Sequence, residues 1–63
     1  MIEKKFLLHL GQGDIEEVTV KIDENIQYTL KDFTDDVKKS NGWFVVGNKS
    51  IQVRHIKKII QIS

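Results

Sequence analysis

The spacing of apolar residues changes along this chain, and the change limits the folds that it can adopt. Between Val18 and Ile22 apolar residues recur at every second position, which is typical of a strand with one buried face. Leu30, Phe33 and Val37 then recur at spacings of three and four, which is typical of a helix with one apolar stripe. The chain is therefore expected to combine strands with a helix.

The alternating segment is expected to be the second strand of a β-hairpin. A short apolar strand over Lys5–Leu10 precedes it, and Gly11–Asp14 between the two contains residues that tolerate a positive φ angle. Ile15 falls out of phase with Val18, which predicts a β-bulge at Ile15.

The helix is expected near residues 30–40. Thr29 is the candidate N-cap, acidic residues crowd the first turns, and lysines crowd the last one, so both ends complement the helix dipole. Asn41-Gly42 provides a left-handed stop.

A second hairpin is expected after the helix. The apolar segment Trp43–Val46 predicts a strand that is covered on both faces, with Trp43 as the main filler of the core. Gly47–Ser50 supplies the turn, and Ile51–Arg54 alternates again. A helical turn near His55–Lys58 is then expected to lead into a last short strand, because the isoleucines that follow favour β structure.

The order strand, strand, helix, strand, strand, strand predicts an α+β fold. The strands would form a small antiparallel sheet or a partly open barrel, with the helix against one face or across the mouth. The 63 residues are expected to form a single domain, 1–63. A chain of this length buries only about 60% of its surface, so a deep enzyme pocket is not expected and oligomerisation would add stability.

The last third of the chain resembles the ends of short uncharacterised proteins from Gram-positive bacteria and their phages. The residues that carry the resemblance are Asn41–Val46, the glycine turn after them, and Ile51–Ile59. In those proteins an aromatic strand, an alternating apolar strand and an isoleucine-bearing turn close the domain. The resemblance implies a phage or prophage accessory protein and carries over no catalytic residue.

Side chains with catalytic or metal-binding chemistry are few and scattered. His9 and His55 lie far apart, and no carboxylate stands at ligand spacing from either of them. Gly11–Gly13 lacks the third glycine and the following helix of a dinucleotide-binding loop, and no serine has a neighbouring histidine. The chain has no cysteine. No catalytic residue, metal or cofactor is therefore expected.

Hydropathy predicts neither a membrane span nor a secretory signal. No segment approaches the roughly 18 apolar residues of a span, and the N-terminal apolar stretch lacks a cleavage pattern of small residues. A cytoplasmic protein without a membrane partner is expected.

Charge is strongly polarised along the chain although the net charge is only +1. Eight acids stand against two lysines between Asp14 and Asp36, whereas six basic residues and no acid follow from Val37 to Ser63. Cross-strand pairs of Glu16 or Glu17 with Arg54 or Lys57 would neutralise this pattern locally. Otherwise the basic end could contact nucleic-acid phosphates, or the two poles could bind a protein partner.

Two functions follow as hypotheses. The first is a non-enzymatic interaction or accessory module that self-associates through an exposed strand edge and an apolar face. The second is a nucleic-acid-binding module that uses a basic C-terminal rim and a stacking aromatic ring. The candidate contacts with a partner or nucleic acid are Lys49, Arg54, Lys57, Lys58, Trp43 and Tyr28.

Overall fold

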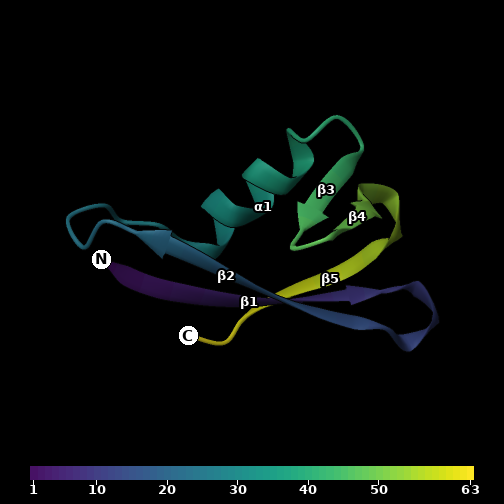
Figure 1. Ribbon diagram of the computed structural model, residues 1–63, viewed down its shortest axis with the longest axis horizontal. Helices are drawn as coiled ribbons and strands as arrows, with labels where there is room; N and C mark the ends of the chain where they lie inside the picture. Colours follow the sequence, from purple (N-terminus) through teal and green to yellow (C-terminus); the bar gives the residue numbers. More distant parts are fainter.

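One helix and two antiparallel sheets make up the protein, as the computed structural model of residues 1–63 shows (Figure 1). In chain order the elements are β1 (Ile2–Leu10), the short 3-10 helix η1 (Gly11–Gly13), β2 (Ile15–Ile22), α1 (Leu30–Lys38), β3 (Trp43–Val46), β4 (Lys49–Gln52), the short 3-10 helix η2 (Val53–His55) and β5 (Ile56–Gln61). The α+β class and the predicted order of strands and helix are confirmed.

The larger sheet has three strands in the order β2-β1-β5, and β3 pairs with β4 in a separate two-stranded sheet. β1 is central and antiparallel to both of its neighbours. The start of β1 and the end of β5 therefore lie at the same end of the molecule (Figure 1). The outer edges of β2 and β5 are unpaired.

The core lies between α1 and the inner face of the three-stranded sheet. Phe6 and Leu8 of β1 are fully buried there, and the Phe33 ring of α1 stacks on Phe6 with ring centroids 4.1 Å apart. Val37 lies one helical turn further on, and Ile51 of β4 completes the buried set. Phe33 and Val37 of the predicted helical stripe thus remove apolar area from water, whereas Leu30, the first residue of that stripe, is 37% exposed.

The start of α1 is held by a capping box. The Thr29 amide donates to Oδ2 of Asp32 at 2.8 Å, and the Asp32 amide donates to Oγ1 of Thr29 at 3.3 Å. These bonds satisfy amides that a helix start leaves without intrahelical partners. After the helix, Asn41 and Gly42 both have positive φ angles, 57° and 87°, and turn the chain into β3. Both predicted helix signals are confirmed.

The predicted bulge at Ile15 is wrong. β1 and β2 pair in one unbroken register, from Ile2 opposite Ile22 to Ile15 opposite His9. Ile15 is out of phase with Val18 because its side chain belongs to the outer face of the sheet, where it is 53% exposed.

The irregularity lies instead between β1 and β5. Leu10 pairs with Ile56 but His9 pairs with Lys58, so Lys57 is an extra residue in β5. This bulge allows both Ile56 and Ile59 to pack against the core, although residues three apart in a regular strand face opposite sides.

The second hairpin contradicts the prediction that its first strand is covered on both faces. Phe44 packs inward against Phe33, with ring centroids 5.8 Å apart, whereas Trp43 and Val45 are 52% and 66% exposed. The core lies on only one side of the two-stranded sheet. Trp43 is therefore not the main filler of the core.

The turn of this hairpin and the helical turn after it also begin or end at other residues than predicted. The turn has only two residues, Gly47 and Asn48, so that β4 begins at Lys49. The helical turn is η2, which begins two residues earlier than expected and takes Val53 and Arg54 out of the strand. The Val53 amide donates to the Gly42 carbonyl at 2.9 Å, and this bond ties η2 to the start of β3.

Candidate functional site

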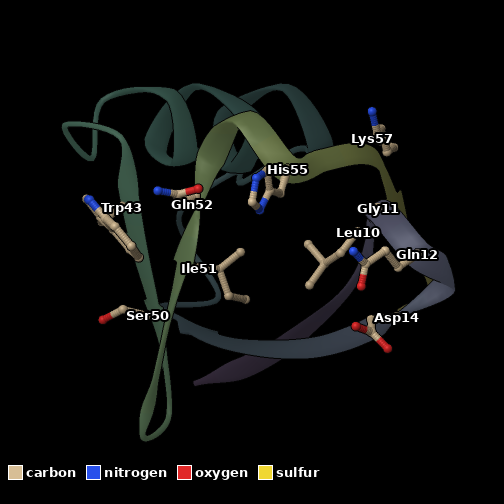
Figure 2. Close-up of a pocket in the computed structure, with 10 residues that line it drawn as sticks. All are labelled: Leu10, Gly11, Gln12, Asp14, Trp43, Ser50, Ile51, Gln52, His55 and Lys57. Atoms are coloured by element: carbon tan, nitrogen blue, oxygen red, sulfur yellow. The ribbon is translucent and has the colours of Figure 1, made fainter.

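A cleft of about 540 Å³ lies between the β1–β2 turn and the second hairpin. Its floor contains Leu10 and Ile51, and Figure 2 shows Trp43, Gln52 and His55 on the side of the second hairpin and η2. Lys57 also lines the cleft, beyond His55 in the same view. The remaining lining residues, Gly11, Gln12, Asp14 and Ser50, come from the two hairpins.

Strand alternation explains why an aromatic ring borders this cleft. Trp43 is the first residue of β3, and Phe44, its neighbour, points into the core. Successive side chains of a strand point to opposite faces, so Trp43 must point outward. An exposed tryptophan ring offers a flat apolar surface with one hydrogen-bond donor.

A second depression, of about 290 Å³, lies between α1 and β5. We call it the lysine hollow, because Lys38, Lys57 and Lys58 line it together with Thr34, Ile56 and Ile59. Thr34 and Lys38 are four residues apart on α1 and therefore share one side of the helix. No carboxylate lines this hollow.

The structure brings together only part of the predicted contact set. Trp43 and Lys57 line the cleft, and Lys57 and Lys58 line the lysine hollow. Arg54 lies in η2, where its Nε donates to Oε1 of Gln52 at 3.2 Å, and its side chain is exposed. Gln52 itself lines the cleft, so Arg54 lies beside the cleft without lining it.

Lys49 is engaged elsewhere. Its ammonium lies 3.0 Å from Oε1 of Glu16 and links β4 to β2. The predicted pairing of Glu16 or Glu17 with Arg54 or Lys57 is wrong: Glu16 pairs with Lys49, Arg54 contacts Gln52, and β1 separates β2 from the β5 strand that carries Lys57. The acidic and basic parts of the chain therefore neutralise each other at this contact, but not at Lys57.

Tyr28 is a structural residue rather than a contact in the cleft. Its ring packs edge-on against Phe6, with centroids 6.3 Å apart, and its hydroxyl donates to Oδ2 of Asp36. Burial raises the pKa of the Tyr28 hydroxyl above its usual value, and the hydrogen bond to the Asp36 carboxylate raises it further. Tyr28 thus fixes the loop before α1, away from Trp43.

Sequence reasoning missed the roles of Lys38, Gln52 and His55. The sequence placed Lys38 on the outer side of the helix and at its C-terminal end, where it complements the dipole, but did not indicate that it lines the lysine hollow. The i, i+4 spacing of Thr34 and Lys38 was a signal that the two share one helix side. Nothing in the sequence indicated that this side faces Lys57, because that contact depends on how α1 crosses the sheet.

The cleft and the lysine hollow combine an exposed aromatic ring with amide, imidazole and ammonium groups. The structure contains no group of three or more His, Cys, Asp or Glu side chains that could hold a metal ion. His9 faces the outer side of the three-stranded sheet and His55 lines the cleft, so the two histidines do not share a site. Aromatic stacking and pairing with anions are the interactions that these residues offer.

Comparisons of this chain with protein-family models, curated proteins and solved structures give no match. No helix in the structure has the length and apolar character needed to cross a membrane.

Proposed function

We propose that the protein is a non-enzymatic interaction module that associates with a second copy of itself. The proposed contact is the outer face of the three-stranded sheet. The apolar residues of that face are Leu7, Ile15 and Ile60, and Ile62 follows them beside Lys5, to whose carbonyl its amide donates. This proposal places the protein in the cytoplasm as a phage or prophage accessory protein, a role that the resemblance of its last third implies.

The main support is the exposure of isoleucine on that face. Ile15 and Ile62 are 53% and 48% exposed, at opposite edges of the sheet. Between them, Leu7 is directly opposite Ile60, and neither of these two packs against the core. The four residues form a diagonal apolar band with His9, Glu17, Lys5 and Lys58 beside it, and an apolar patch with a polar rim is typical of a protein interface.

Charge and area favour a second copy as the occupant. Glu17 lies beside Leu7 and Lys5 beside Thr19 on the same face, so a twofold axis can bring opposite charges together. The molecule measures 36 × 22 × 22 Å, so the contact would have to cover one whole long side to reach the roughly 800 Å² per partner of a standard interface. Two such sheets can stack face to face about 10 Å apart.

Sedimentation velocity over a hundredfold range of protein concentration in the micromolar region tests the proposal. The expected result is a monomer–dimer equilibrium that Ile15→Lys and Ile62→Lys each shift toward the monomer. Val45→Lys is the matched control, because Val45 is even more exposed, at 66%, but lies on the two-stranded sheet.

Two outcomes would contradict the proposal. A strict monomer across the whole range removes self-association and leaves only a different protein as partner. A dimer that responds to Val45→Lys but not to the two isoleucine variants would place the contact on the second hairpin.

A further inference from the structure

The cleft and the lysine hollow adjoin, because Lys57 lines both of them. We propose that together they bind single-stranded nucleic acid, with phosphates at Lys38 and Lys57 and a base stacked on Trp43. Trp43, Lys38 and Lys57 are not among the residues proposed for self-association.

The lysines of the hollow are free to pair with a ligand. The ion pairs of the protein are Lys31 with Asp35 and Lys49 with Glu16, so Lys38 and Lys57 have no carboxylate partner. Both side chains are exposed. Ile56 and Ile59 form the apolar part of the lining.

The wall of the cleft supplies the groups that bases require. In Figure 2, Trp43, Gln52 and His55 follow one another along one wall, and Lys57 lies beyond them. Flat rings accept bases of any sequence by stacking, and a neighbouring cation holds the backbone. The Gln52 amide can hydrogen-bond to a base edge.

One acidic residue restricts the path that the single-stranded nucleic acid can take. Asp14 lines the cleft near Gln12, across from Trp43 in Figure 2, and would repel a phosphate there. The phosphates are therefore expected to run along η2 toward the hollow. Asp14→Asn should tighten binding at low salt, since it removes this repulsion.

A flat stacking ring beside free lysines favours nucleic acid over an acidic protein segment. An acidic segment would use the lysines but would gain little from the exposed ring of Trp43. The two classes of ligand therefore differ in their dependence on Trp43 as well as in their charge.

The single tryptophan of the chain is a built-in probe. Titration of the full chain with oligothymidylate of about ten nucleotides at low salt should quench the Trp43 emission as bases stack on the ring. The logarithm of the affinity should fall with the logarithm of salt concentration, with a slope of about −0.7 for each neutralised phosphate.

Variants separate the contribution of the phosphate contacts from that of base stacking when binding is followed by the anisotropy of a labelled oligonucleotide. Lys38→Gln combined with Lys57→Gln should reduce the salt slope by about 1.4 units, because two phosphate contacts are lost. Trp43→Ala should lower the affinity about fivefold to a hundredfold without changing the slope. Lys4→Gln combined with Lys21→Gln removes the same charge at the far end of the first hairpin and should leave the slope unchanged.

Three results would overturn the proposal. The first is no binding at low salt, where a phosphate contact is strongest. The second is equal quenching of Trp43 by polyglutamate of similar length, which would assign the surface to acidic protein segments. The third is an equal loss of salt slope in the Lys4→Gln, Lys21→Gln control, which would show that binding depends only on the net charge of the protein. Each result can be obtained whether the protein is a monomer or a dimer.

Discussion

Phe33 of α1 and Trp43 of β3 are aromatic residues ten positions apart, and they have opposite environments. Phe33 is 1% exposed between Phe6 and Phe44, whereas Trp43 is 52% exposed beside an open cleft. Trp43 has the larger apolar surface, so hydrophobicity alone would have buried it first. Their difference teaches that burial in so small a protein depends on whether a residue lies on the face of its helix or strand that is turned toward the core.

The largest effect that tests this comparison is the loss of the Phe33 ring. Phe33→Ala should destabilise the protein by about 3–5 kcal/mol, because it removes the stacked partner of Phe6 and leaves a cavity. That loss approaches the whole stability of many small domains. Trp43→Ala should cost about 1 kcal/mol, since half of its side chain is already in water.

Urea unfolding followed by far-ultraviolet circular dichroism measures both variants, because this signal does not depend on the tryptophan. Similar losses for Phe33→Ala and Trp43→Ala would contradict the division between a buried helical face and an exposed strand face.

The next effect concerns how firmly α1 is held over the core. Thr29→Ala removes the side chain that caps the Asp32 amide and should cost about 0.5–2 kcal/mol. Thr34→Ala is the control within the same helix, because the Thr34 hydroxyl only donates to the Leu30 carbonyl inside the helix. If the two variants were equally stable, packing of Phe33 and Val37 alone would hold the helix.

A pH effect also tests the capping box at the start of α1. Hydrogen bonds from the backbone and then the side chain of Thr29 hold the pKa of the Asp32 carboxyl below its usual value. The folded-state pKa is thus lower than the unfolded-state pKa of about 3.9. The stabilisation by Asp32 is complete above that value and is lost as the pH falls through the folded-state pKa.

Asp32→Asn should therefore flatten the decline in stability below about pH 4, the unfolded-state pKa of an aspartate. Urea midpoints measured at a series of acidic pH values check this expectation. A decline in Asp32→Asn as steep as that of the original protein would show that other carboxyl groups dominate acid unfolding.

The smallest effect is expected on the solvent side of α1. Lys31 lies 3.2 Å from Asp35, and their side chains are 85% and 42% exposed. Such pairs contribute little in water, so Lys31→Ala should change the free energy of unfolding by no more than about 0.5 kcal/mol. A loss comparable to that of Thr29→Ala would mean that the exposed side of α1 has a contact that the structure does not indicate.

Local signals predicted α1 and the first hairpin well. The spacing of Phe33 and Val37, the capping residue Thr29 and the left-handed Asn41-Gly42 all act within a few residues of the chain. The alternation over β2 acts over a similar range: Val18, Val20 and Ile22 are half-buried as the sequence indicated, and Glu16 shares their face. Such features depend on local geometry, so the sequence can reveal them without knowledge of the fold.

Part of the candidate site was also predictable. Trp43, Lys57 and Lys58 were named from the basic, aromatic character of the C-terminal part and do line the cleft or the hollow. Tyr28 and Lys49 were named on the same grounds, but contacts with Phe6 and Asp36, and with Glu16, occupy them. These contacts join segments distant in sequence, and composition carries no information about them.

The sequence by itself determined where the helix begins and which side of it is apolar, because hydrogen bonding and periodicity act over neighbouring residues. Only the tertiary structure decided that Trp43 is exposed, that the bulge lies at Lys57, and that Lys38 meets β5. These features depend on which side of each sheet the core occupies and on how α1 crosses the strands. Distant parts of the chain must pack together before the position of the core and the crossing of α1 are defined.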